Sequence, residues 1–179
     1  MSRMEVLLTA EQIRVRVGEL AAEIRQQYAG RPFTVVGILT GSLVFLADLI
    51  RKIELPLHIG LIEASSYRGT ATSAGTLVVQ DSLLPDVAGR HLLLMDDILD
   101  TGRTISTLVE HMNHRGAASV RTCVLLRKIG RQQVAFEPDY TGFAIPDKFV
   151  IGYGLDFNDD YRHLPFIGVL PDPPADGHA

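Results

Sequence analysis

The stretch that decides the fold is His91-Leu-Leu-Leu-Met-Asp-Asp-Ile-Leu-Asp-Thr-Gly-Arg-Thr-Ile105. Its apolar part, residues 92–95, has no polar face, which predicts a strand buried on both sides, as in a parallel sheet. The adjacent carboxylates Asp96 and Asp97 follow this strand, and Asp100 comes three residues later. The chain then enters a helix-like segment. The stretch therefore predicts a strand, a turn and a helix, which together are typical of an α/β fold.

The turn over residues 101–104, Thr-Gly-Arg-Thr, is expected at the N-terminus of that helix. The first N–H groups of a helix are unpaired and its dipole favours negative charge, so this turn predicts an anion site. An isolated Asp-Thr-Gly would usually be ordinary turn and cap chemistry. Three acids within five positions are costly, however, unless a cation or a donor-rich ligand compensates them. We therefore predict a phosphate cradle beside acids that could hold sugar hydroxyls, Mg²⁺ or a proton.

Outward from this stretch, the sequence alternates between the two kinds of element. Thr9 and Gln12 fit a capping box, with apolar residues at helical spacing after them. Further helices are expected over 43–52 and from 104 to about 114, and strands over 33–39, 57–64, 76–80 and 119–126. This order predicts a mostly parallel central sheet flanked by helices. Ligands bind at the carboxyl ends of such strands, where the Thr40–Gly41 turn and the two adjacent acids are expected.

Composition and charge restrict the class of protein. The chain has 179 residues, enough for one domain, which we place over 1–170, with a hood mainly over 138–170 built from short strands. The proline-rich residues 171–179 are expected to be a disordered tail. A net charge of −4 argues against nucleic acid as the main partner. The absence of a signal peptide or membrane-length apolar run favours a cytoplasmic protein with no membrane partner.

Two segments together resemble a known family. Residues 96–104 resemble the phosphoribosyl pyrophosphate signature of type I phosphoribosyltransferases, in which two acids precede a D-T-G-x-T loop. Residues 146–162, Pro-Asp-Lys-Phe-Val-Ile-Gly-Tyr-Gly-Leu-Asp-Phe-Asn-Asp-Asp-Tyr-Arg, resemble the purine-binding hood of hypoxanthine-guanine phosphoribosyltransferases. The resemblance runs from about residue 33 to about residue 170. It implies the type I phosphoribosyltransferase fold and a purine salvage enzyme that transfers 5-phosphoribosyl to N9 of hypoxanthine or guanine, releasing pyrophosphate.

The resemblance also implies a set of phosphate and sugar ligands. It places the 5′-phosphate on Asp100, Thr101, Gly102, Arg103 and Thr104, and pyrophosphate on Thr40, Gly41 and Arg162. It implies that Asp96 and Asp97 orient the ribose hydroxyls, directly or through Mg²⁺, and that Asp156 coordinates Mg²⁺ on the pyrophosphate side. Many relatives carry a basic residue where this chain has Thr40. Backbone N–H groups can still bind pyrophosphate there, although affinity and coupling between subunits are put in doubt.

For the purine, the resemblance implies one proton-transfer group and several recognition groups. Asp100 corresponds to the general acid/base near N7. Lys128 corresponds to the lysine that reaches O6, and since an ammonium can only donate, adenine's 6-amino group should be rejected. Phe149 would stack on the base and the Val150 carbonyl would accept from guanine's 2-amino group. The remaining implied residues are Lys148 in the hood, and Ser66 and Tyr67 at the start of a mobile lid.

Other readings remain open at this point. A related enzyme that acts on xanthine is one alternative, because xanthine differs from guanine only in the 2-oxo group that would face Val150. Adenine and pyrimidines are disfavoured as substrates by Lys128. A non-catalytic, nucleotide-sensing regulator of the same fold would need a basic surface or an added nucleic-acid-binding domain, which this acidic chain lacks. The resemblance further implies a homodimer or homotetramer. Hypoxanthine and guanine are not ranked by the sequence.

Overall fold

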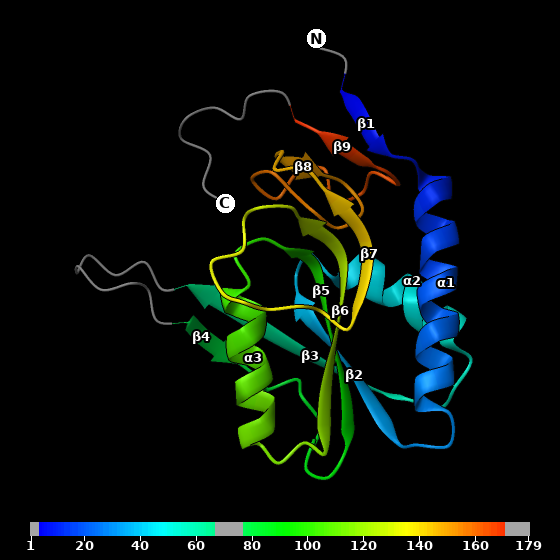
Figure 1. Ribbon diagram of the computed structural model, residues 1–179, viewed down its shortest axis with the longest axis vertical. Coiled ribbons are helices and arrows are strands. Elements are labelled where there is room, and N and C mark those ends of the chain that lie inside the picture. The colour runs from blue at the N-terminus through cyan, green and yellow to red at the C-terminus, as the bar shows by residue number, and fades with distance from the viewer. Residues whose placement is uncertain (1–3, 67–76, 171–179) are drawn as a thin grey trace, which may run out of the picture.

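A central sheet of six strands organises the molecule (Figure 1). The computed structural model describes residues 4–66 and 77–170. The strand order is β4-β3-β2-β5-β6-β7, and only the β3–β4 pair is antiparallel. The strands are β2 (Phe33–Leu39), β3 (His58–Ser66), β4 (Leu77–Gln80), β5 (His91–Leu99), β6 (Ser119–Lys128) and β7 (Tyr140–Ile145). The mostly parallel α/β sheet predicted from the sequence is confirmed.

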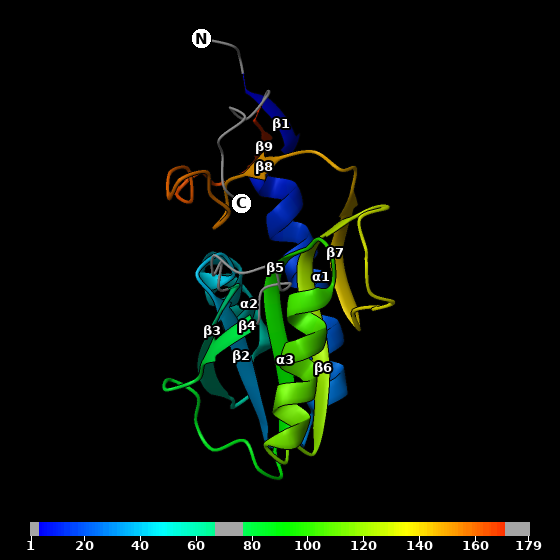
Figure 2. The same ribbon diagram turned by 90° about the vertical axis from the view of Figure 1, so that its left-hand side faces the viewer.

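In the described ranges, three helices cover the two faces of this sheet. Helices α1 (Ala10–Tyr28) and α2 (Leu43–Ile53) pack together on one face, and α3 (Arg103–His114) covers the other (Figures 1 and 2). The predicted capping box opens α1, with Thr9 Oγ1 accepting from the Gln12 N–H and Gln12 Oε1 accepting from the Thr9 N–H. No described helix combines the length and apolar character needed to cross a membrane.

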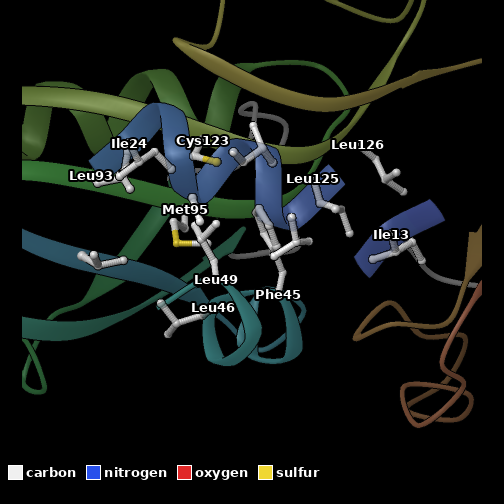
Figure 3. Packing of buried hydrophobic residues seen from close by; sticks show 14 of the residues in the cluster. Ile13, Ile24, Phe45, Leu46, Leu49, Leu93, Met95, Cys123, Leu125 and Leu126 are labelled. Atoms are coloured by element: carbon white, nitrogen blue, oxygen red, sulfur yellow. The ribbon is translucent and has the colours of Figure 1, made fainter. Parts of the chain in front are cut away.

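The two faces of β5 explain why its apolar run has no polar side. Leu93 and Met95 point into the core under α1 and α2, where they meet Phe45 and Cys123 (Figure 3). Their neighbours on the strand, such as Leu92, join the core under α3. Successive side chains of a strand point to opposite faces, so a strand covered by helices on both sides must be apolar throughout. Burial also raises the pKa of the Cys123 thiol, consistent with a packing role.

A small antiparallel sheet lies above the carboxyl ends of the central strands and forms the hood (Figure 1). It consists of β1 (Glu5–Leu8), β9 (Ile167–Val169) and β8 (Val150–Ile151), in that order. The structure corrects two details of the expected hood range, 138–170. Strand β7 pairs with β6 in the central sheet, where Ile145 is buried, and β1 from the N-terminal segment completes the hood.

Candidate active site

Two neighbouring strands of the central sheet, β2 and β5, bring the predicted sugar-phosphate residues together. The Thr40–Gly41 turn follows β2, and the peptide bond that enters it, between Leu39 and Thr40, is cis. Strand β5 continues to Leu99, so the two adjacent acids lie within the strand, as its sixth and seventh residues, instead of after it. Pairing with β6 carries the strand that far, since Asp96 is still in register with Val124.

A cavity of about 290 Å³ opens at these strand ends. It contains residues from the turn after β2, the acidic end of β5, the start of α3 and the hood. The predicted site residues that line it are Thr40, Gly41, Asp96, Asp97, Asp100, Thr101, Gly102, Thr104, Asp156 and Arg162. Leu39, which begins the predicted turn, also lines it, together with five residues that were not predicted to belong to the site: Ile38, Ala64, Ile98, Leu99 and Ile105. Arg103 is exposed as the first residue of α3 and does not line the cavity.

The two adjacent acids at the cavity, Asp96 and Asp97, are costly to ionise despite one hydrogen bond to each. Asp96 Oδ1 accepts from the Asp97 N–H at 3.0 Å, and Asp97 Oδ1 accepts from the Ile98 N–H at 2.8 Å. Desolvation by the surrounding protein raises the pKa of both carboxyls, and repulsion from Asp97 raises that of Asp96 further. A bound cation would offset both the desolvation of the two carboxylates and the repulsion between them.

These donors fit Mg²⁺ only together with substrate. Carboxylate oxygens suit this hard ion, which is usually held by one or two carboxylates plus substrate phosphates. Among residues 4–66 and 77–170, no three metal-ligating side chains come close enough to hold a metal by themselves. Asp96 and Asp97 would therefore hold the ion jointly with sugar oxygens, and Asp156 would do so jointly with pyrophosphate oxygens.

The start of α3 has the form expected of a phosphate cradle. Gly102 is the residue before the helix, and its φ of 84° is a left-handed conformation that favours glycine. Gly102 has no side chain with which to cap the helix, and the Arg103 N–H donates to Thr101 Oγ1 at 3.4 Å. Among the described residues no side chain caps the next N–H groups, those of Thr104 and Ile105, which remain available to an anion. Gly102 itself is buried, and a Cβ added to it would lie 3.5 Å from Phe136 Cβ and from the Val134 carbonyl oxygen of the β6–β7 connection.

The Thr40–Gly41 turn is packed tightly between the acids and the hood. A Cβ on Gly41 would lie 1.7 Å from Asp97 Oδ2, so only glycine lets the turn approach that carboxylate. On the other side, a Cβ on Gly154 would lie 2.2 Å from the Gly41 carbonyl oxygen. The hood therefore contacts the turn directly through two glycine backbones, without room for a methyl group between them.

A second cavity, of about 270 Å³, adjoins the first and is where a planar base would fit. The two cavities share Asp97, Ile98, Asp100 and Asp156. The second contains the predicted Lys128, Phe149 and Val150, and also Leu155 and Asn158, which sequence reasoning had not named. Phe157 packs edge-on against Phe149, with ring centroids 5.7 Å apart at 89°, and so fixes the orientation of that ring.

Lys128, at the end of β6, is the most enclosed cation of the site. Its side chain is 12% exposed, and its Nζ lies 3.4 Å from Asp147 Oδ1 and 3.8 Å from Asp100 Oδ2. Asp100 Oδ1 accepts a hydrogen bond of 2.9 Å from Nε of Arg131. Neither Arg131 nor Asp147 was named from the sequence, because the β6–β7 loop and the segment before β8 meet only in the folded chain.

Three further predicted residues lie elsewhere or are differently engaged. Lys148 lines neither cavity and pairs with Glu5 of β1 at 3.3 Å, which ties the two ends of the hood together. Ser66 is the last residue of β3, at the edge of the described range, and Tyr67 lies outside the described residues.

Arg162 is held in place by contacts with other residues of the hood. Its Nη1 donates to the Gly154 carbonyl at 2.8 Å and lies 2.9 Å from Asp156 Oδ1, and its Nη2 donates to Asp159 at 3.0 Å. The proposed pyrophosphate arginine is thus paired with the proposed metal ligand Asp156.

The arrangement of these two cavities at the strand ends agrees with the class of protein that the comparisons show, a phosphoribosyltransferase. The sequence model of the phosphoribosyl transferase domain matches residues 4–158. A hypoxanthine-guanine phosphoribosyltransferase of Streptococcus pneumoniae is 40% identical over 166 residues, which are 93% of this chain and 92% of that protein.

Solved structures agree with this assignment. The crystal structure of a hypoxanthine phosphoribosyltransferase from Staphylococcus aureus superposes with a TM-score of 0.88 at 40% identity, covering 93% of this chain and 91% of that one. A mutant of the Trypanosoma cruzi hypoxanthine phosphoribosyltransferase, in a ternary complex with substrates, gives a TM-score of 0.87 at 37% identity, covering 93% of this chain and 95% of that one. The chain belongs to the hypoxanthine-guanine phosphoribosyltransferases, within the phosphoribosyltransferase family.

Proposed function

We propose that this protein transfers the 5-phosphoribosyl group of phosphoribosyl pyrophosphate to N9 of hypoxanthine or guanine, in purine salvage. One observation carries the proposal: the phosphate-cradle cavity and the base cavity meet at Asp97 and Asp100. A sugar phosphate in one cavity and a planar base in the other would face each other at that junction. The N9–C1′ bond would form there as the bond from C1′ to pyrophosphate breaks.

The phosphate end would be held mainly by backbone. The N–H groups at the start of α3, with the Thr101 and Thr104 side chains, would hold the 5′-phosphate. The Thr40–Gly41 turn and Arg162 would hold pyrophosphate. Asp96 and Asp97 would orient the ribose hydroxyls and, with Asp156, share Mg²⁺ with the substrate. When bound, that ion would supply neutralisation of the charge that develops on the leaving pyrophosphate.

The base end would combine one proton-transfer group with a selective donor. Asp100 lines both cavities, and we assign it the proton at N7 as N9 becomes bonded to the sugar. Lys128 would donate to O6, which fits a 6-oxopurine and leaves adenine's amino group facing another donor. Phe149 would stack on the ring, and the Val150 carbonyl would accept from the 2-amino group of guanine.

The test is nucleotide formation from phosphoribosyl pyrophosphate and Mg²⁺ with hypoxanthine, guanine, xanthine and adenine offered separately. Turnover of hypoxanthine or guanine, with adenine excluded, is the expected result. A preference for xanthine would contradict the assignment of the Val150 carbonyl as the acceptor for the 2-amino group of guanine. Tight nucleotide binding without turnover of any base would identify a non-catalytic regulator and overturn the proposal.

We also propose that the protein forms a homodimer or homotetramer and acts in the cytoplasm on small-molecule substrates alone. The oligomer rests on family resemblance, and sedimentation equilibrium tests it. A monomer at micromolar concentration would contradict it.

A further inference from the structure

We propose that Arg131 is a positioning residue that orients the Asp100 carboxylate for proton transfer, an inference that rests on the function proposed above. Arg131 lies in the connection between β6 and β7, outside both cavities. Its Nε donates to Asp100 Oδ1 at 2.9 Å. Among the described residues this is the only hydrogen bond made by the Asp100 side chain.

The hydrogen bond distinguishes the two oxygens of the carboxylate. Arg131 occupies Oδ1, whereas Oδ2 lies 3.8 Å from Nζ of Lys128, too far for a hydrogen bond. Lys128 lines the base cavity, so Oδ2 is the oxygen on that side. A carboxylate fixed at one oxygen by a charged donor has one rotamer to present, which is the condition for effective proton transfer.

The segment that carries Arg131 is anchored on the site itself. The Gln133 and Val134 N–H groups both donate to the Thr101 carbonyl, at 2.9 and 3.3 Å, next to Asp100 in the chain. Nε2 of Gln132 donates to the Lys128 carbonyl at 2.7 Å. The position of Arg131 is therefore tied to both the phosphate cradle and the base cavity.

Asp147 completes a balanced cluster of two cations and two anions. Its Oδ1 lies 3.4 Å from Lys128 Nζ and 3.7 Å from Arg131 Nε. Without Arg131, Lys128 would be the only cation paired with either carboxylate in the described part of the chain, and it would be drawn toward Asp100. Arg131 thereby also leaves the ammonium of Lys128 available to O6 of the purine.

The ion pair between Arg131 and Asp100 is too exposed to contribute much to the stability of the fold. The Arg131 side chain is 46% exposed and that of Asp100 is 36% exposed. Ion pairs at such positions contribute little to the free energy of unfolding. Removal of the guanidinium should therefore leave the folded protein intact and change the geometry of Asp100 alone.

The test is a double-mutant cycle in the full chain with phosphoribosyl pyrophosphate, Mg²⁺ and hypoxanthine. Arg131→Gln should lower kcat on the order of tenfold or more, the scale expected when a catalytic group is misplaced, with little change in KM for phosphoribosyl pyrophosphate. In an Asp100→Asn background the same substitution should have no further effect on kcat. Arg131→Lys, which retains a charged donor, should restore part of the loss.

Arg127→Gln is the matched control. Arg127 also spans the β6–β7 connection, through an ion pair of 2.6 Å with Glu137, but lines neither cavity. Its substitution should leave kcat unchanged. Equal losses for Arg131→Gln with and without Asp100, or equal losses for Arg131→Gln and Arg127→Gln, would overturn the inference alone. A wild-type protein without turnover would instead overturn the proposed function and the inference with it.

Discussion

The sharpest consequence of the packing concerns Gly41, the residue at which the Thr40–Gly41 turn meets Asp97. In Gly41→Ala, the new Cβ would lie 1.7 Å from Asp97 Oδ2 and 2.6 Å from its Cγ. Ordinary van der Waals contact begins at about 3.4 Å, so the oxygen or the turn must move by well over an ångström.

The turn has little freedom to make that movement. The hood closes its other side, where Gly154 packs against the Gly41 carbonyl. The next residue, Ser42, is buried and its Oγ donates to the Ile38 carbonyl at 2.5 Å. We therefore expect the Asp97 carboxylate to swing away and lose its hydrogen bond from the Ile98 N–H.

The assay is kcat/KM for phosphoribosyl pyrophosphate at saturating hypoxanthine. Misplacement of a substrate-positioning group by about 1 Å can lower the rate by about a hundredfold, and we expect a loss of this order. Gly18→Ala is the matched control, because Gly18 lies in α1 with no atom within 4 Å of its added Cβ. It should gain roughly 0.5–1 kcal/mol of stability and retain full activity. A folded Gly41→Ala protein with near wild-type kcat/KM would refute the reasoning.

Three further predictions follow from the same contacts. Lys128→Ala should lower kcat/KM for hypoxanthine roughly ten- to a hundredfold, the worth of a charge-assisted hydrogen bond, while KM for phosphoribosyl pyrophosphate changes little; equal losses for both substrates would contradict its role. Asp96→Asn should raise the Tm of the protein in EDTA. The pKa of Asp96 is raised in the folded state, so its ionisation costs stability above that pKa and nothing below the ordinary value. The gain in Tm should therefore be largest at neutral pH and disappear as the pH falls below the ordinary aspartate range. Thr9→Ala should lower the free energy of unfolding by about 1 kcal/mol, measured by urea denaturation, because it removes the capping box of α1, and kcat should not change.

The local elements could be predicted because each carries its own periodicity or cap. The capping box at Thr9 starts α1 where expected, and β2 has the predicted bounds, Phe33–Leu39. The unbroken apolar run before Asp96 correctly indicated a strand buried on both faces. These signals depend on neighbours in the sequence, which a single chain displays in full.

Long-range pairing could not be predicted in the same way. Strand β1 is only four residues long, with Glu5 exposed, and becomes a strand because β9 pairs with it. Strand β7 resembles the other short segments near the C-terminus, and only its register with β6 places it in the central sheet. Edge strands owe their pairing to tertiary context more than to propensity.

The site shows the same division. Most of the residues proposed to bind the sugar phosphate lie in one continuous motif, whereas the contacts of Asp100 come from distant segments. Arg131 and Asp147 are separated from it by 31 and 47 positions, and no spacing rule connects them. These charged side chains come together only when the β6–β7 connection and the segment before β8 meet in the folded chain.

The measurement that tests the central claim most directly compares wild type with Asp100→Asn. Binding of phosphoribosyl pyrophosphate with Mg²⁺ would be measured by calorimetry, and formation of the hypoxanthine nucleotide and pyrophosphate in the same preparations. We predict equal binding by the two proteins, one pyrophosphate per nucleotide in the wild type, and turnover strongly reduced in the variant. Near wild-type turnover by Asp100→Asn would contradict the account, since the junction of the two cavities would then not be where the proton moves.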